Sequence, residues 1–277
     1  PLENDYLIRT ADPDQTYHEI ARHSKKDAEN YMRFGPAMGQ IGMAVRPILE
    51  TIAPNPIRPS LSDLSATKVL FNHLKCLSSS QFEYLTKLMT MSSADFLDEW
   101  FEYEPLKATM SASGIIGTFM GPRSPGSAYV MLHHYMGDID GAFRAWGFQR
   151  GGTGGVSMAI ARSAEYFGVE IKTETPVQKV IVKNGKATGV ALDNGDEYNS
   201  NIVISGLDPK VTFLKMIDES DLPSDFVTAI KNFRIRGSSG KVNLALDTLP
   251  NFTCLPGDGH HLRGAISISP SYNHLEK

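Results

Sequence analysis

The sequence predicts a fold of the mixed α/β class (α+β), with a helix-rich part and a small sheet. Three observations support this prediction. Capped amphipathic helices dominate residues 16–101, two Asn-Gly turns separate short alternating runs after residue 176, and an apolar run at 202–204 precedes a helix start at Asp208 and Pro209. We therefore expect several helices, a three-stranded meander and one buried strand.

A group of glycines, GGTGG at residues 151–155, comes just before a predicted helix. Glycines allow positive φ and close backbone approach, and the free N–H groups of a first helical turn can hold an anion. The helix has one apolar face and stops at Gly168. We expect it to pack on a sheet through Val156, Ile160, Ala164 and Phe167.

Two Asn-Gly turns, at 184–185 and 194–195, are strong hairpin signals between alternating runs. They predict strands near 177–183, 186–192 and 196–199, and a short strand is expected between the preceding helix and this meander. The apolar run 202–204 then predicts a buried strand that leads through Ser205 and Gly206 into the helix capped by Asp208.

The order of these pieces carries a family resemblance. GGTGG opening a helix, GVEIKTETPVQKVIV, an NGKATGVAL hairpin and NIVISGLDP resemble phytoene desaturase-like flavoproteins of the flavin amine oxidase and protoporphyrinogen oxidase superfamily. The likeness extends upstream through SASGIIGTFMGPRSPGSAYVMLHH. Within the family it is nearest to the oxidoreductases named pyridine nucleotide-disulfide oxidoreductase domain-containing proteins. The resemblance implies an FAD-dependent oxidoreductase of dehydrogenase or desaturase type that acts on a fairly apolar small molecule.

The resemblance also implies a domain organisation. Family members open with a GxGxxG turn that seats the FAD pyrophosphate, and a glycine-containing segment near their C-terminus completes the site. Neither is present in these 277 residues, so the chain resembles an internal fragment. Residues 1–147 would be a mostly helical substrate or cap region, 148–208 the second segment of a Rossmann-like FAD-binding domain with its meander, and 209–277 a truncated return to the substrate domain.

By the same resemblance, three groups of residues would touch the cofactor. Val177 would offer its backbone to the adenine ring, and Ser205 and Gly206 would lie near the dinucleotide. The group that would border the isoalloxazine ring or the substrate channel is Gly151, Gly152, Thr153 and Gly154. Without the family, the same residues read as sheet core, strand exit and helix entry. The sequence names no catalytic side chain.

Alone, the glycine group is a weak signal. It follows a loop where a dinucleotide fingerprint needs a strand, and its spacing is not GxGxxG. A Walker motif and the GxSxG elbow are also absent from the sequence, which disfavours phosphate hydrolysis by that route and the usual serine hydrolases. The alternative to an oxidoreductase is a non-catalytic binding or scaffold protein that keeps the fold with a degraded flavin site. The 277 residues alone are expected to bind FAD weakly or not at all.

Composition limits the partners. The net charge is −4 without a run of basic residues, which argues against nucleic acid. Cys76 and Cys254 form neither a CxxC pair nor a metal cluster, so we expect no metal and a reducing compartment, cytoplasmic or, in a eukaryote, the mitochondrial matrix. No apolar run is long enough for a transmembrane segment. Peripheral membrane contact stays open, although core packing of Met32, Met38 and Met43 is favoured.

The remaining elements are predicted from local patterns. We expect a strand at 5–10 and a turn at 11–15. Helices are predicted at 16–23, from Ser24, at 60–77 after a proline-rich linker, from a capping box at Ser80, and from Ser92 to 101. After 209 we expect two amphipathic helices, strands at 241–247 and 262–268, and a short helix in the tail.

Three further groups could take part in chemistry. The loop at 123–127 could leave room for a ligand. His133 and His134 read as core or substrate-wall residues, with a catalytic base as the weaker alternative. The acidic residues between Asp98 and Glu104 read as a solvated helix end.

Overall fold

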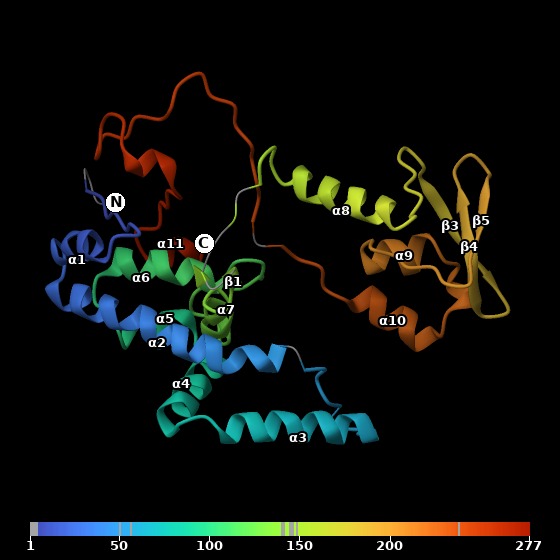
Figure 1. Ribbon diagram of the computed structural model, residues 1–277, viewed down its shortest axis with the longest axis horizontal. Helices are drawn as coiled ribbons and strands as arrows, with labels where there is room; N and C mark the ends of the chain where they lie inside the picture. Colours follow the sequence, from blue (N-terminus) through green and yellow to red (C-terminus); the bar gives the residue numbers. More distant parts are fainter. Residues whose placement is uncertain are drawn as a thin grey trace. The chain divides into compact units, whose positions relative to one another are not determined.

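The computed structural model describes residues 5–49, 51–55, 57–139, 142–143, 147, 149–237 and 239–277. The chain divides into two compact units, Pro1–Trp146 with Arg236–Lys277, and Gly147–Ile235 (Figure 1). Helices and a three-stranded antiparallel sheet are both present, which confirms the mixed α and β class. The Rossmann-like part of the expectation stays a prediction.

The first unit is mainly helical. Its helices are α1 (Pro13–Ala21), α2 (Lys25–Leu49), α3 (Leu61–Lys75), α4 (Ser79–Thr90), α5 (Ser93–Asp98), α6 (Glu104–Ser111), α7 (Ser127–His133) and α11 (Tyr272–Leu275), with 3-10 turns η1 (Ala112–Gly114) and η3 (His260–Arg263). A two-stranded ladder, β1 (Asp138–Ile139) and β2 (Ala142–Phe143), completes the described elements of this unit.

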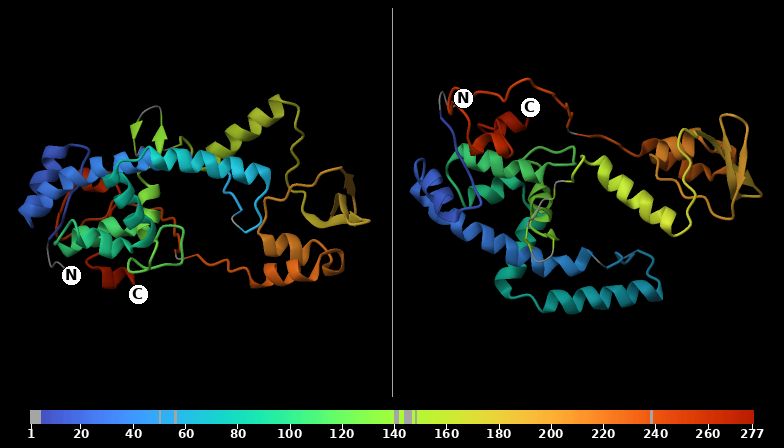
Figure 2. Two further views of the ribbon diagram at one scale, coloured as in Figure 1. Left: turned by 90° about the horizontal axis from the view of Figure 1, so that it is seen from below. Right: turned by 45° about the horizontal axis from the view of Figure 1, so that its top comes forward.

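The core of the first unit lies between α2 and the bundle formed by α4, α5, α6 and α7, which lie beside α2 in both Figure 1 and Figure 2. Phe34 of α2 is 1% exposed and sits at the centre of a group of aromatic rings. Four ring centroids lie 5.2 to 6.3 Å from its own, those of Phe96, Trp100, Phe101 and Tyr135. This cluster fixes α2 against the rest of the unit.

Helix α2 begins where the sequence predicts, because the Ser24 hydroxyl accepts a hydrogen bond from the Asp27 N–H at 3.1 Å. The helix continues through Pro36 to Leu49. The gain from burying Met38, which is 2% exposed, and the residues after it outweighs the hydrogen bond that proline cannot donate. The packing of Met38 in the core is confirmed, whereas Met43 is exposed.

Substitution of alanine for glycine should have opposite effects at two positions of α2. A Cβ at Gly42 would lie 2.5 Å from the carbonyl oxygen of Tyr135, whereas a Cβ at Gly35 would meet no atom within 4 Å. Gly42→Ala should therefore lower the free energy of unfolding by about 1–3 kcal/mol, as overpacking does. Gly35→Ala should raise it by about 0.5–1 kcal/mol through helix propensity. Urea unfolding followed by circular dichroism measures both, and equal gains at the two positions would disprove the close approach.

The structure corrects several boundaries near the N-terminus. Residues 5–10 form no strand, because no described segment pairs with them. The expected turn at 11–15 is instead the start of α1, where Asp12 caps the N–H groups of Asp14 and Gln15. The capping box of α4 is formed by Ser78 and Gln81 rather than by Ser80 and Glu83. The cap of α5 at Ser92 is confirmed, although that helix ends at Asp98.

The two strands predicted in the C-terminal part are wrong. Residues 241–247 and 262–268 contain no strand, and Val242 and Leu244 are more than 70% exposed. Alternating apolar and polar residues give a strand one apolar face. A strand also needs a hydrogen-bonded neighbour, and no described segment pairs with these residues. The short tail helix is confirmed as α11, whose Tyr272 is buried beside α5 and α6.

The second unit contains α8 (Gly154–Tyr166), β3 (Val177–Lys183), β4 (Lys186–Leu192), β5 (Glu197–Asn199), α9 (Pro209–Lys215), the 3-10 turn η2 (Glu219–Asp221) and α10 (Ser224–Asn232). The antiparallel order β3-β4-β5 confirms the predicted meander. Asn184 and Gly185 have φ angles of 52° and 73°, as the tight hairpin between β3 and β4 requires. The Asp208 cap of α9 is also confirmed.

Three expectations for the second unit fail. No strand forms between α8 and β3, and 202–204 is not a strand. Ile202 and Ile204 are 74% and 89% exposed, so the run is not buried either. Helix α8 has no buried residue, and Val156, Ile160 and Phe167 of its apolar face are 48% to 79% exposed. One reason explains all three. A strand that is apolar on both faces lies within a parallel sheet, and a helix such as α8 packs on the face of one, but the described residues form no parallel sheet.

Candidate functional site

The glycine turn before α8 has the predicted backbone. Gly151 and Gly152 have φ angles of 81° and 82°, in the left-handed region that favours glycine. The turn closes through the Gly152 N–H to the Gln149 carbonyl at 3.0 Å and the Gly155 N–H to the Gly152 carbonyl at 3.0 Å. A Cβ at Gly155 would lie 2.9 Å from the Arg150 carbonyl, so this fourth glycine is required by the turn itself.

The open side of this turn is the N-terminus of α8. Thr153 occupies the N-cap position, and its side chain makes no capping hydrogen bond. A Cβ at Gly151, Gly152 or Gly154 would meet nothing within 4 Å, so the backbone is accessible there. Two N–H groups of the first turn are already used, because Gly155 donates to the Gly152 carbonyl at 3.0 Å and Val156 to the Thr153 carbonyl at 3.1 Å. The turn therefore offers a ligand its open backbone around Gly151, Gly152 and Gly154, and nothing on it performs chemistry.

The other predicted cofactor residues lie around the meander. Val177 is the first residue of β3, pairs with Leu192 and is 40% exposed. The Ser205 hydroxyl shares a hydrogen bond of 2.7 Å with the Thr212 hydroxyl on α9, and it accepts from the Leu207 N–H at 3.2 Å. These contacts fix Ser205 at the entry to α9.

Gly206 departs from its prediction in one respect. Its φ angle is not positive, and a Cβ there would meet no atom within 4 Å. The chain itself therefore places no steric demand on this glycine, contrary to the buried strand exit that the sequence suggests. The assembly of the glycine turn, Val177 and the Ser205 segment into one cofactor site stays a prediction.

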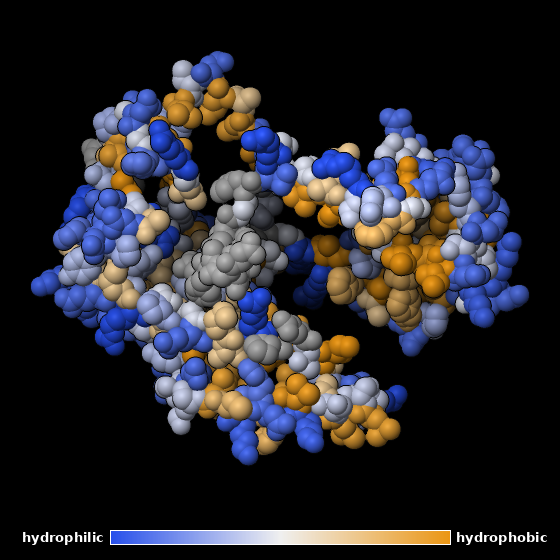
Figure 3. Space-filling view, viewed as in Figure 1, coloured by the Kyte–Doolittle hydropathy of each residue, from blue (hydrophilic) through white to orange (hydrophobic). Residues whose placement is uncertain are grey.

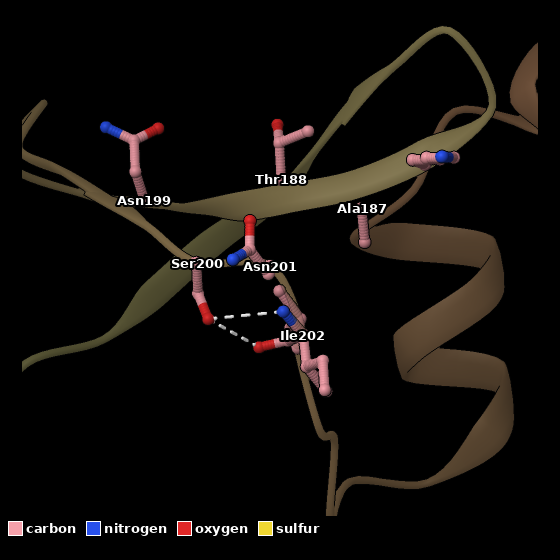
Figure 4. Close-up of a pocket in the computed structure, with 8 residues that line it drawn as sticks. Ala187, Thr188, Asn199, Ser200, Asn201 and Ile202 are labelled. Atoms are coloured by element: carbon pink, nitrogen blue, oxygen red, sulfur yellow. Dashed lines mark hydrogen bonds between the residues drawn. The ribbon is translucent and has the colours of Figure 1, made fainter.

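A hollow beside the meander was not predicted. It has a volume of about 590 Å³, and Figure 4 shows the side chains that line it and the two hydrogen bonds between Ser200 and Ile202. Its lining consists of Lys186, Ala187 and Thr188 of β4 and of Asn199, Ser200, Asn201, Ile202 and Val203. The lining side chains offer hydroxyl, amide and ammonium groups but no carboxylate, imidazole or thiol, so the hollow suits binding rather than acid-base chemistry. In the sequence these residues look like ordinary solvent-exposed residues of a hairpin. No sequence pattern therefore indicates the hollow.

Two lysines of the second unit, Lys172 and Lys179, are paired with carboxylates on the surface. Lys179 of β3 bonds Asp218, which raises the pKa of the lysine. The N–H of Val180 donates to the Met216 carbonyl at 2.9 Å, so the end of α9 is bound to β3. Glu170 raises the pKa of Lys172, whose ammonium lies 5.6 Å from the ring centre of Tyr198. Each lysine is thus engaged by a neighbouring carboxylate.

The histidines and the loop of the first unit give no active centre. His133 is exposed, which contradicts a core position, and its ring lies 4.6 Å from that of Tyr129. His134 is half-buried at the end of α7. In the loop at 123–127, Ser127 is fully buried, accepts from the Ser93 N–H at 2.8 Å and donates to the Pro122 carbonyl at 3.1 Å, whereas Arg123 and Pro125 are exposed. Room for a ligand in this loop stays a prediction.

The acidic group at the end of α5 is structural. Lys107 bonds Asp98 at 2.6 Å and Glu104 at 3.3 Å, so two of the exposed carboxylates share one lysine whose side chain is only 12% exposed. Across the described part of the chain, no three or more His, Cys, Asp or Glu side chains gather as a metal site would require. In the same part, no helix is both long and apolar enough to cross a bilayer.

Known proteins give the family context. The chain is 35% identical over 258 residues to pyridine nucleotide-disulfide oxidoreductase domain-containing protein 2 of Rattus norvegicus, an alignment that spans 90% of this chain and 44% of the rat protein. The Mus musculus protein of the same name is 37% identical over 270 residues, 92% of this chain and 46% of that protein. The chain is a homologue of these oxidoreductase-domain proteins. The resemblance predicted from the order of its motifs is thereby confirmed.

A weaker relative adds a second name. Prolycopene isomerase of Daucus carota is 34% identical over 113 residues, which is 40% of this chain and 18% of the carrot protein. No family model matches the sequence. The chain spans slightly less than half the length of the rat and mouse relatives. The names of the relatives therefore place it among oxidoreductase-related proteins.

Proposed function

We propose that the intact protein is an FAD-dependent oxidoreductase of dehydrogenase or desaturase type, and that its substrate is a fairly apolar small molecule. The homology to oxidoreductase-domain proteins over nine tenths of the chain carries this proposal. The carrot relative is named for an isomerase of prolycopene, and that name supports only the broad substrate class. The bound flavin would supply the redox chemistry, and the protein would orient the substrate.

In this proposal the second unit is one contribution to the flavin-binding domain. The exposed apolar face of α8 and the exposed residues Ile202 and Ile204 support it, because both surfaces suit burial within a larger α/β domain. The glycine turn would then border the flavin ring or the substrate channel, Val177 the adenine, and Ser205 and Gly206 the dinucleotide. The helical first unit would contribute to the substrate site.

The residues of this chain could accommodate a flavin cofactor in two places. The backbone of the glycine turn is open at Gly151, Gly152 and Gly154, and the backbone at Gly206 is open to close approach as well. Neither place contains a proton donor or acceptor side chain with a fixed partner. This chain therefore contributes binding and orientation, and no catalytic residue is assigned.

The proposal predicts a selective loss of flavin at Gly206. In the protein extended at both ends to the length of its relatives, Gly206→Val should lower bound flavin per protein by about tenfold or more, because a branched side chain blocks the approach of the cofactor. The substitution meets no atom of this chain, so the free energy of unfolding should change little. Bound flavin is measured by absorbance after heat release.

Two control variants accompany this measurement. Gly264→Val changes another glycine with open space, at an extended backbone position in the first unit, and should keep full flavin. His134→Ala should also keep flavin. Full flavin in Gly206→Val would remove Ser205 and Gly206 from the site, and lost turnover in His134→Ala with flavin retained would make His134 a candidate base. A flavin-free wild-type protein would favour the scaffold alternative.

A further inference from the structure

Helix α3 carries an outward stripe of apolar and basic side chains. The stripe consists of Leu61, Leu64, Lys68, Phe71 and Lys75, which follow one another at spacings of three and four residues and so share one helical face. Leu61 is 87%, Leu64 57% and Phe71 63% exposed. Figure 3 shows apolar and hydrophilic residues intermixed over this helix at the lower edge of the view.

The other side of the helix holds α3 to the first unit. Leu74 is half-buried and packs against the main core, as does Leu77 just after the helix. The His73 imidazole is hydrogen-bonded to the Ala44 carbonyl of α2. Because the inner face makes these contacts, the outward orientation of the stripe is fixed.

The loop before α3 extends the apolar surface. Ile52 and Ile57 are 88% and 85% exposed. The Asn55 side-chain oxygen accepts from the N–H groups of Ile57 at 2.9 Å and Arg58 at 3.1 Å, so the turn that presents them is hydrogen-bonded. Two large aliphatic side chains held almost entirely in solvent need a reason, since burying each would gain about 1.5–3 kcal/mol.

The charged side chains that the structure describes on this surface have one sign. Arg58, Lys68 and Lys75 are exposed and form no ion pair with any residue that the structure describes. The nearest acidic side chain in α3, Asp63, lies off the stripe and accepts hydrogen bonds from Ser60 and from the Asn55 N–H. A partner that matches this surface therefore has an anionic outer layer and an apolar interior.

We propose that α3 and the described residues before it, 52–55, 57 and 58, dock on the surface of a membrane that contains anionic lipids. The apolar side chains enter the boundary between headgroups and acyl chains, and the three basic side chains extend to the phosphates. At about 1.5 Å per residue, a helix of 15 residues is about 22 Å long, too short to span the hydrocarbon core of about 30 Å. The helix therefore lies in the plane of the surface. This goes beyond the proposed function and does not depend on flavin.

Vesicle sedimentation tests the proposal on the protein at the full length of its relatives. Vesicles of phosphatidylcholine with one quarter phosphatidylglycerol should bind the protein at least about tenfold more tightly than vesicles of phosphatidylcholine alone, since each basic residue near an anionic surface contributes a factor of about five. Raising the salt concentration should release it. Lys68→Glu with Lys75→Glu should remove the preference for phosphatidylglycerol.

Apolar variants separate the stripe from the rest of the surface. Leu61→Ser, Leu64→Ser and Phe71→Ser together should lower binding to the mixed vesicles by about tenfold or more. Phe82→Ser with Met89→Ser on α4 removes comparably exposed apolar side chains outside the stripe and should leave binding unchanged. Circular dichroism checks that each variant is folded.

Three outcomes would overturn the proposal. The first is a wild-type protein that binds neither kind of vesicle. The second is a stripe variant that binds as the wild type does. The third is a wild-type dimer in light scattering that the stripe variant converts to a monomer, because the stripe would then be covered by a second copy of the chain.

Discussion

Replacement of Phe34 by alanine should lower the free energy of unfolding by about 3–5 kcal/mol, the usual cost of removing a buried phenylalanine. Its side chain is 1% exposed, and four aromatic rings surround it, so its removal leaves a cavity that the helices cannot close without moving. This free energy has two parts, the burial of the ring that is lost and the cost of the cavity that remains. Urea unfolding followed by tryptophan fluorescence reports on it, because Trp100 lies 5.2 Å from Phe34 between ring centres.

The matched control is Phe71→Ala on α3. Phe71 is 63% exposed, so the same chemical change should alter the free energy of unfolding by less than about 0.5 kcal/mol. Equal losses at the two positions would mean that the cluster around Phe34 is not the centre of the first unit.

Replacement of Asp27 by alanine should cost about 2–4 kcal/mol. The Asp27 carboxylate is fully buried and accepts from the backbone N–H groups of Glu102 at 3.0 Å and Tyr103 at 2.8 Å. Alanine would leave both donors without this acceptor, at about 1–3 kcal/mol for each group, and the partial burial of Glu102 and Tyr103 keeps the sum in the lower part of that range. Asp27→Asn keeps an acceptor oxygen and should lose less. Thermal unfolding by calorimetry distinguishes the two variants.

Glu102→Ala is the control for Asp27. The Glu102 side chain is exposed and pairs with Lys26 at 3.1 Å on the surface, where ion pairs contribute little. Its backbone N–H still bonds Asp27 in the variant. A drop in stability as large as that of Asp27→Ala would show that the surface pair, not the buried carboxylate, joins α2 to the segment before α6.

Elements encoded by neighbouring residues could be predicted. The meander follows from two Asn-Gly turns between alternating runs, and the caps at Ser92 and Asp208 follow from side chains that reach the next helical turn. The positive φ angles of Gly151 and Gly152 belong to the same class. In each case the residues that decide the structure lie within a few positions of one another.

Features that depend on distant partners could not be predicted. Asp27 resembles a helix-start residue in the sequence, but its side chain binds backbone groups 75 residues away. The runs at 202–204 and 241–247 have apolar patterns typical of strands, yet a strand forms only where another segment pairs with it. For the candidate site, the backbone of the glycine turn was predictable from glycine alone, whereas the open environment of Gly206 was not.

Flavin content tests the central claim most directly. The protein extended to the length of its relatives should be purified, saturated with FAD, freed of unbound cofactor and measured for flavin absorbance per protein. We predict close to one flavin per protein, and for the 277-residue chain a dissociation constant weaker than about a micromolar, roughly −8 kcal/mol. A full-length protein that retains no flavin after saturation would contradict the account.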